Sequence, residues 1–324
     1  MLKNNIYLSE IDLIYKYLIK LNFKKKETFN FQNDGAFLNK KKDKDIVVTN
    51  DTIVESIDFF KNDDPESIAH KIITYNLSDL SSMGAFPYSY TLSLSLPKGI
   101  NIKWIKRFIK KLFYLQKKYK IFLLGGDVSQ SNQIHISANF FGYVKKDIII
   151  QRKQAKINDS IWITGNIGDS YIGLLIKKKK LRVNNKFKKY FINKYLYPNP
   201  CMIGSKIIGY SKCGIDISDG FLSDLSKLLN KSLGADLLYS KIPFSKNTNN
   251  LINNKLIDPF SLLNGGDDYE LIFTSPKIND DKILNIAKKN NYKITKLGSI
   301  IDSEGIFIDG KKITSFKQSY EYLF

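Results

Sequence analysis

Six short acidic motifs are spread along the sequence, and their residue types suit metal and phosphate chemistry. They are Asn33-Asp34-Gly35, Thr49-Asn50-Asp51-Thr52, Asn76-Leu77-Ser78-Asp79, Gly125-Gly126-Asp127, Asp216-Ile217-Ser218-Asp219-Gly220 and Gly265-Gly266-Asp267-Asp268. Two of them follow apolar runs typical of strands, at 46–48 and 121–124. Aspartates at strand ends can converge, and Mg²⁺ prefers carboxylate, phosphate and water oxygens. The pattern predicts a metal and phosphate centre built from aspartates.

The length requires more than one hydrophobic core. At 324 residues with 43% hydrophobic composition, the chain is predicted to be globular with two domains. The stretch from about 145 to 160 is polar and precedes a new apolar run, so we place the boundary there, giving domains 1–145 and 146–324. Both halves alternate strand and helix signals, which favours an α/β or α+β fold.

Individual elements can be predicted around the motifs. Strands are expected at 45–49, 88–96, 120–124, 134–144, 161–164 and 270–274, and helices at 9–21, 65–83, 103–118, near 170 and from 221. Ser9 is expected to cap the first helix, whose apolar stripe includes Ile11. On the helix over 65–83, Asn76 falls within the apolar stripe and Asp79 at its edge, where a carboxylate needs a partner or a metal.

The net charge of +20 comes almost entirely from lysine. Only three of the 51 basic residues are arginine, Arg107, Arg152 and Arg182. Proteins that read nucleic acid rely on arginine for bidentate contacts, so a solvated lysine surface is favoured over a nucleic-acid footprint. A basic nucleic-acid-binding protein remains the alternative from a different class.

Other features bear on location and on the kind of chemistry. The two cysteines, Cys201 and Cys213, lack metal-site spacing and are too few for a disulfide framework. No apolar run reaches membrane-spanning length and no signal peptide begins the sequence, so we expect a cytoplasmic protein that is not bound to a membrane.

The residues available for catalysis restrict the chemistry. Only His70 and His135 are present, and the phosphate loop and protein-kinase motifs are absent, so we expect aspartates and bound metal to hold any phosphate.

The motifs together resemble the thiamine-monophosphate kinase family, in the superfamily that includes aminoimidazole ribonucleotide synthetase and selenophosphate synthetase. The resemblance extends through Leu77–Ala85 after Asn76 and Tyr269-Glu270-Leu271 after Asp268, in the family's order over nearly the whole chain. It implies transfer of the ATP γ-phosphate to thiamine phosphate, with several Mg²⁺ ions and ATP as co-substrate. It also implies a two-domain aminoimidazole ribonucleotide synthetase-like fold whose N-terminal domains pair into a dimeric β-barrel.

The resemblance assigns roles by position. Metal ligands would be Asp34, Thr49, Asn50, Asp51, Asp79, Asp127, Asp216 and Asp219; ATP contacts would be Gly126, Asp127, Arg152 and Ser218; thiamine-substrate contacts would be Asp58, Asp267 and Tyr320. No residue is assigned as a general base, because a phosphate monoester with a second pKa near 6 is already largely ionised at neutral pH.

The sequence departs from the family pattern at four positions, three of which have roles assigned above. Asn33 stands for the first of two usual acids, and Asn50 for a common threonine. Asp58 replaces a usual histidine and Asp267 a usual glutamate, both on the substrate side. Another ATP-dependent member of the superfamily is the nearest enzymatic alternative. The selenophosphate enzyme is disfavoured because no cysteine lies in the first 200 residues.

Overall fold

The computed structural model describes residues 9–316 and divides into two compact units. The first unit runs to Leu80 and resumes over Phe86–Lys145. The second comprises Ser81–Ala85 and the described residues from Lys146 on. Ser81 and Ser82, the last two residues of a helix that begins in the first unit, are therefore grouped with the second.

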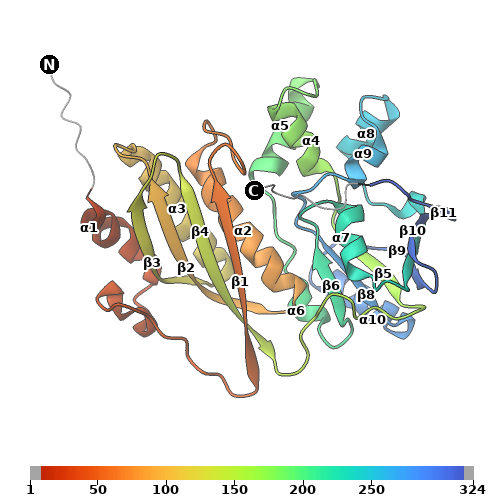
Figure 1. Ribbon diagram of the computed structural model, residues 1–324, viewed down its shortest axis with the longest axis horizontal. Helices are drawn as coiled ribbons and strands as arrows, with labels where there is room; N and C mark the ends of the chain where they lie inside the picture. Colours follow the sequence, from red (N-terminus) through yellow and green to blue (C-terminus); the bar gives the residue numbers. More distant parts are fainter. Residues whose placement is uncertain (1–8, 317–324) are drawn as a thin grey trace. The chain divides into compact units, whose positions relative to one another are not determined.

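A four-stranded sheet forms the first unit. Its strands are β1 (Lys44–Val54), β2 (Phe86–Leu96), β3 (Phe122–Gln130) and β4 (His135–Lys145), in the order β1-β4-β2-β3. β4 pairs antiparallel with β1 and β2, whereas β2 and β3 are parallel. Helices α2 (Pro65–Ser82) and α3 (Ile102–Tyr119) cover one face of this sheet (Figure 1).

The two faces of the sheet differ in polarity and exposure. Along β1, Val47, Thr49 and Ile53 are buried, while Ile46 and Val48 are 44% and 56% exposed. This alternation follows from the period of two in a strand. The buried face packs against α2 and α3, and the opposite face carries exposed apolar side chains.

The strands carrying two of the acidic motifs are longer than predicted. Thr49, Asn50 and Asp51 lie inside β1, in continuous register with β4 from Lys44 to Val54. Gly125, Gly126 and Asp127 lie inside β3, paired with β2. The prediction that these motifs follow strand ends is therefore wrong, because neighbouring strands satisfy the backbone hydrogen bonds of the polar residues too. Asp216, in contrast, is the last residue of its strand.

The N-terminal segment is less regular than the predicted helix over 9–21. It consists of a short α1 (Glu10–Asp12), a π-helical turn η1 (Leu13–Tyr17) and a 3₁₀ turn η2 (Leu18–Asn22), followed by η3 (Lys26–Phe31). Ser9 caps it as predicted, accepting a hydrogen bond from the Asp12 amide. The predicted stripe is wrong at Ile11, which is 69% exposed, because the π turn shifts the buried side to Leu13.

The helix predicted over 65–83 is confirmed as α2, ending one residue early at Ser82. Gly84 follows with a φ of +76°, where a side chain would be strained. A Cβ there would also lie 2.9 Å from a methyl carbon of Ile208. The sharp turn after α2 thus depends on glycine.

A seven-stranded mixed sheet organises the second unit, in the order β11-β10-β7-β9-β5-β8-β6. The strands are β5 (Ser160–Thr164), β6 (Cys213–Asp216), β7 (Gly234–Leu237), β8 (Leu271–Ser275), β9 (Ile294–Ile301), β10 (Gly305–Ile308) and β11 (Lys311–Lys312). Alternate residues of β5 and β8 enter two separate cores. Ile161 and Ile272 pack with α7 (Phe221–Leu228), whereas Trp162 and Phe273 pack with residues of α6 (Gly204–Ile207) and α10 (Asp280–Lys289).

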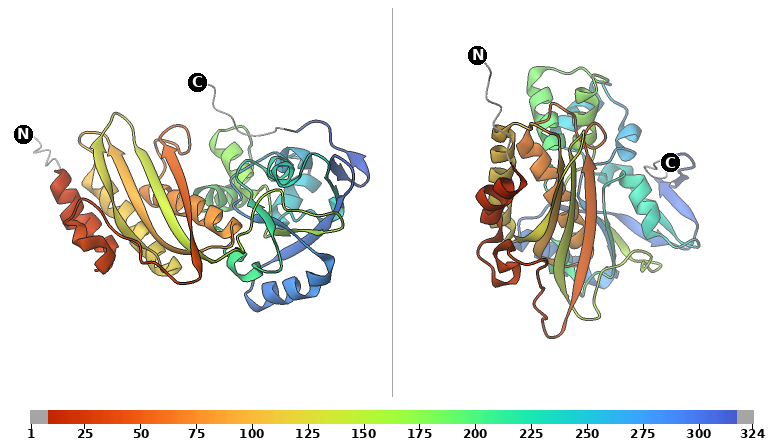
Figure 2. Two further views of the ribbon diagram at one scale, coloured as in Figure 1. Left: turned by 60° about the horizontal axis from the view of Figure 1, so that its bottom comes forward. Right: turned by 60° about the vertical axis from the view of Figure 1, so that its left-hand side comes forward.

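A further helical group surrounds a small apolar cluster of its own in the second unit. It contains α4 (Asp169–Lys177), α5 (Asn185–Leu196), α8 (Lys246–Asn253) and α9 (Pro259–Leu263), with the short turns η4 (Tyr239–Lys241) and η5 (Lys277–Asn279) elsewhere in this unit. Figure 2 shows these elements from two further sides. Within residues 9–316, no helix has the length and apolar character needed to cross a membrane.

Candidate active site

A buried hydrogen-bond chain joins β1 to α2 next to the predicted metal ligands. The Thr49 hydroxyl donates to Asn76 Oδ1 at 3.0 Å, and Asn76 Nδ2 donates to the Ile72 carbonyl at 3.0 Å. Asn76 is fully buried, which explains a polar residue in an apolar stripe. Asp79 is half-buried one turn further along α2. The chain fixes the register between the strand that carries Asp51 and the helix that carries Asp79.

Asp51 has an uncompensated carboxylate oxygen. Its Oδ2 is buried and has no hydrogen-bond partner among the described residues. Burial, reinforced by the negative charge of Asp58, raises the pKa of Asp51 to about 6. A buried acceptor without a donor is costly unless something else compensates it, and a divalent cation would do so. Asp51 Oδ2 is therefore an oxygen ligand of the kind that Mg²⁺ prefers.

The neighbouring predicted residues are held by the sheet and by a turn. Asn50 is exposed, and its Nδ2 donates to Asn139 Oδ1 at 2.9 Å. Asp58 Oδ2 accepts from the Val54 amide at 2.7 Å, which closes the turn after β1. The Lys71 ammonium, almost completely buried, donates to the Asp58 carbonyl at 3.0 Å. Asp58 thus closes the turn after β1, and its negative charge helps to raise the pKa of Asp51.

A cavity of about 310 Å³ in the first unit brings Asp34 together with Gly126 and Asp127, which lie far from it in sequence. Asp34 lies on its wall with Gly126 and Asp127 of β3. The remaining wall is partly apolar, with contributions from η1, η2 and the end of η3. This grouping agrees with a shared ligand for Asp34 and the Gly125-Gly126-Asp127 motif.

Gly126 permits the close approach of two strands. A Cβ at this position would lie 1.8 Å from the Leu92 carbonyl oxygen of β2. At Gly125 a Cβ would meet nothing within 4 Å. The motif therefore needs glycine at its second position for packing, and leaves open space beside the first.

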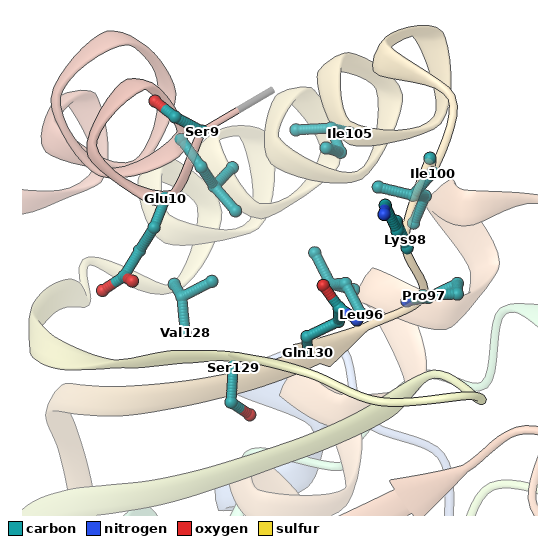
Figure 3. Close-up of a pocket in the computed structure, with 12 residues that line it drawn as sticks. Ser9, Glu10, Leu96, Pro97, Lys98, Ile100, Ile105, Val128, Ser129 and Gln130 are labelled. Atoms are coloured by element: carbon teal, nitrogen blue, oxygen red, sulfur yellow. The ribbon is translucent and has the colours of Figure 1, made fainter. Parts of the chain in front are cut away.

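A separate cavity of about 320 Å³ lies between α1, α3 and the ends of β2 and β3 (Figure 3). Glu10, Leu96, Lys98 and Val128 line it with eight other residues, none of which was predicted as a site residue. We do not assign it to the site.

In the second unit, a buried carboxylate organises the loop after β6. Asp224 Oδ2 accepts hydrogen bonds from the backbone amides of Ser218, Asp219 and Gly220 at 2.9 to 3.1 Å. Gly220 is the N-cap residue of α7 and has no side chain that could accept a hydrogen bond from the helix amides. Asp224, inside the first turn of α7, accepts from the backbone amides that precede the helix. The sequence analysis missed this role, although an acidic residue in a first helical turn is a recognisable signal.

Lys227 joins the two carboxylates of this loop. Its Nζ lies 2.5 Å from Asp219 Oδ2 and 2.7 Å from Asp224 Oδ1. Asp216, at the end of β6, is almost fully buried. The predicted metal ligand Asp219 is consequently ion-paired with a lysine that the sequence analysis did not single out.

The loop that carries Asp267 is hydrogen-bonded to the loop after β6. The Asp267 amide donates to the Ser218 carbonyl at 3.0 Å, and the Tyr269 amide donates to the Ile217 carbonyl at 2.9 Å. The Tyr269 hydroxyl donates to Asp267 Oδ1 at 2.9 Å. A Cβ at Gly266 would lie 2.1 Å from the Ser218 carbonyl oxygen, so glycine is needed there.

Asp268 has a structural role at the start of α4. Its Oδ2 accepts from the Gly168 amide at 2.8 Å, so a carboxylate of the chain itself satisfies the start of α4. Burial raises the pKa of Asp268 well above its ordinary value and that of Glu270 to about 7. The glycine turn before α4 is therefore a tight structural turn whose Gly168 amide is bound by a carboxylate of the chain.

Two predicted residues remain apart from these groups. Arg152 is exposed, next to the bridge between Gln151 and Cys213. Tyr320 lies outside the described residues. Within 9–316, no three His, Cys, Asp or Glu side chains gather so as to hold a metal ion.

Comparison with known families defines the class of protein. The family model of the AIR synthase related protein N-terminal domain matches residues 32–144, and that of the C-terminal domain matches residues 156–311. Both units thus correspond to a family domain, and the two-domain mixed α/β fold expected from the motifs is confirmed.

Similar proteins narrow the class. A thiamine-monophosphate kinase from Buchnera aphidicola subsp. Acyrthosiphon pisum is 36% identical, covering 97% of this chain and 98% of the relative. The crystal structure of the thiamine-monophosphate kinase from Stenotrophomonas maltophilia is 28% identical with a TM-score of 0.83, covering 95% and 99%. AaThiL complexed with AMPPCP and TMP is 28% identical with a TM-score of 0.78, covering 97% of both chains. This chain belongs to the thiamine-monophosphate kinase family.

Proposed function

We propose that this chain transfers the γ-phosphoryl group of ATP to thiamine phosphate, giving thiamine diphosphate and ADP. The family membership and the AMPPCP and TMP bound to AaThiL support this reaction. The structural observation that carries it is the buried Asp51 Oδ2 without a hydrogen-bond partner, on the strand that also bears Thr49. A carboxylate in that state fits a reaction in which cations accompany phosphates.

The proposed metal and substrate contacts are the residues that the family resemblance assigns by position. Mg²⁺, when bound, would neutralise the phosphates and align donor and acceptor for in-line transfer. The residues proposed to hold it are Asp34, Thr49, Asn50, Asp51, Asp79, Asp127, Asp216 and Asp219. Gly126, Asp127, Arg152 and Ser218 are proposed to contact ATP, and Asp58, Asp267 and Tyr320 the thiamine substrate.

The chain's own residues contribute position and charge. The Thr49 and Asn76 hydrogen bonds hold β1 against α2, so Asp51 and Asp79 stay in fixed register. Asp224 holds the Ser218–Gly220 backbone in one conformation. No side chain needs to remove a proton from the acceptor phosphate, and histidine plays no part in the proposal.

The homodimer with a shared β-barrel is also a proposal. The uncovered face of the first sheet exposes Ile46 and Val48, and Val48 lies opposite the half-buried Phe141 of β4. A second copy of this chain would bury such a patch and pair the two open sheets. The domain limits 1–145 and 146–324 are kept as part of this proposal.

An assay with ATP, Mg²⁺ and thiamine phosphate tests the function by measuring thiamine diphosphate. We expect product with the wild type and a loss of at least about 100-fold in kcat/KM for Asp51→Asn and for Asp79→Asn. Asp302→Asn, which changes an exposed aspartate, is the matched control. No thiamine diphosphate from the wild type, or full activity in Asp51→Asn, would reject the proposal.

A further inference from the structure

The connection between η3 and β1, residues 32–43, carries Asp34 and contains no helix or strand. Asp34 and its neighbours from Asn33 to Ala36 nevertheless form part of the wall of the cavity that contains Gly126 and Asp127. Something other than regular secondary structure must keep this connection in place.

A buried carboxylate holds the middle of the connection. The Phe37 amide donates to the Glu27 carbonyl at 3.1 Å, just after the Asp34 turn. The Glu27 side chain, 5% exposed, accepts from the Tyr88 hydroxyl at 2.7 Å and from Asn39 Nδ2. The Tyr143 hydroxyl donates to the Asn39 carbonyl at 2.5 Å. Glu27 thereby links the connection to β2, and Tyr143 links it to β4.

Lys41 adds a second attachment of a different kind. Its ammonium lies 4.1 Å from the ring centroid of Tyr143 and 4.7 Å from that of Tyr88. The two rings meet edge to face with centroids 5.0 Å apart. Cation–π contacts of this kind favour one position of the lysine over the solvated alternatives. Tyr88 thus holds Asn39 through Glu27, Tyr143 holds it directly, and the rings of both tyrosines contact Lys41.

The charge of Glu27 and the strained backbone before the connection both indicate that these contacts are needed to hold residues 32–43 in place. Burial alone would raise the pKa of Glu27, but the Tyr88 hydroxyl and nearby lysines outweigh it, so the pKa lies below its ordinary value and the acceptor is charged. Phe29, Asn30 and Phe31, directly before the connection, all have φ between 46° and 60°. Non-glycine residues persist there only when surrounding contacts hold them.

We propose that Glu27, Asn39, Lys41, Tyr88 and Tyr143 form a positioning cluster, the Glu27 cluster, which fixes residues 32–43 so that Asp34 faces Gly126 and Asp127. The proposal rests on the proposed function, because it takes the cavity of Asp34 and Asp127 as the nucleotide and metal site. The Glu27 cluster does not touch the reacting groups. It lowers the cost of ordering Asp34 when MgATP binds.

Hydrogen exchange of the metal-free, ATP-free protein tests whether the Glu27 cluster holds residues 32–43 in place, without depending on catalysis. Glu27→Gln keeps the shape and removes the charge, and Tyr88→Phe keeps the ring and removes the donor. Both are expected to speed exchange of peptides within 32–43 at least about fivefold and to leave peptides of α3 unchanged. Unchanged exchange in both variants would overturn the cluster as the anchor of the connection.

Steady-state kinetics test whether the Glu27 cluster helps MgATP to bind by ordering Asp34. Both variants are expected to raise KM for MgATP about three- to tenfold while kcat stays within about twofold, since the affected step is ordering of Asp34. Lys41→Gln should show the same split, and Lys42→Gln, the exposed neighbour for which the structure describes no ring contact, should not. Faster exchange with an unchanged KM would reduce the cluster to a purely structural role and overturn the proposal. A wild type without kinase activity would reject the proposed function while the exchange result still stood.

Discussion

The Lys227 ammonium bridges Asp219 Oδ2 and Asp224 Oδ1 at 2.5 and 2.7 Å, so a lysine occupies one oxygen of a proposed metal ligand. A divalent cation that binds Asp219 must share or displace that contact. Lys227 also keeps Asp219 compensated when no cation is bound, because the two groups neutralise one another.

Lys227→Met is therefore expected to strengthen binding of Mn²⁺, used as a probe for Mg²⁺, about three- to tenfold in the ATP-free protein. Calorimetric titration measures this directly, and Lys231→Met, which removes an exposed positive charge nearby, is the control. Weaker binding in Lys227→Met would show that the lysine supports the site and does not compete for it.

Asp51 predicts a pH dependence of stability. Its folded pKa of about 6 exceeds the ordinary value of 3.8, so the folded protein holds this proton more tightly than the unfolded chain. The free energy of unfolding without metal should fall by about 3 kcal/mol as pH rises from about 4 to 6, and stay lower above pH 6. Urea unfolding in EDTA should show this loss in the wild type and not in Asp51→Asn. Equal pH slopes in the two proteins would contradict the assignment.

Gly126→Ala should be far more damaging than Gly125→Ala. The added methyl at Gly126 would lie 1.8 Å from the Leu92 carbonyl oxygen, which forces β2 and β3 apart, whereas the methyl at Gly125 enters open space. We expect a loss of at least about 3 kcal/mol in unfolding free energy for the first and under about 1 kcal/mol for the second. Similar melting temperatures for the two variants would count against the strand pairing described.

Asp58→Asn should improve use of the thiamine substrate. The asparagine keeps an oxygen for the Val54 amide and removes a negative charge beside Asp51 and the proposed binding site of an anionic phosphate. KM for thiamine phosphate is expected to fall about two- to fivefold with KM for ATP nearly constant. An increase in KM for thiamine phosphate would indicate that the Asp58 carboxylate itself contacts the substrate favourably.

Val48→Lys tests the proposed dimer. Val48 is 56% exposed on the uncovered face of the first sheet, and a lysine there would place a charge inside an apolar interface. Sedimentation should show a dimer for the wild type and a monomer of unchanged melting profile for the variant. Lys44→Ala, at the exposed start of the same strand, serves as the control.

The sequence predicted elements best where local signals agree. α2 combines an N-terminal proline, an apolar stripe and a following Gly84, and its limits were predicted within one residue. β1 and β3 were predicted too short because Asn50-Asp51 and Gly125–Asp127 look like loop sequences, and only pairing with β4 and β2 makes them strand. Ile11 was misplaced because nothing local reveals a π turn.

The candidate site, too, could be predicted only in part from the sequence. Residue types identified the aspartates, since carboxylates are chemically distinctive. Sequence could not show that Asp219 is paired with Lys227, that Asp224 holds three amides, or that Asp51 Oδ2 lacks a partner, because these depend on contacts fixed by tertiary structure. The role of Tyr320 stays a prediction.

Two backbone hydrogen bonds, from the Asp267 amide to the Ser218 carbonyl and from the Tyr269 amide to the Ile217 carbonyl, join two loops. One loop carries Asp267, proposed to contact thiamine phosphate, and the other carries Ser218, proposed to contact ATP, so the two loops should move together. Since backbone groups form the link, no side-chain substitution removes it directly. A change that shifts either loop should alter the Michaelis constants of both substrates together. Thiamine specificity in this enzyme would then be hard to redesign without also changing how tightly it holds its phosphate donor.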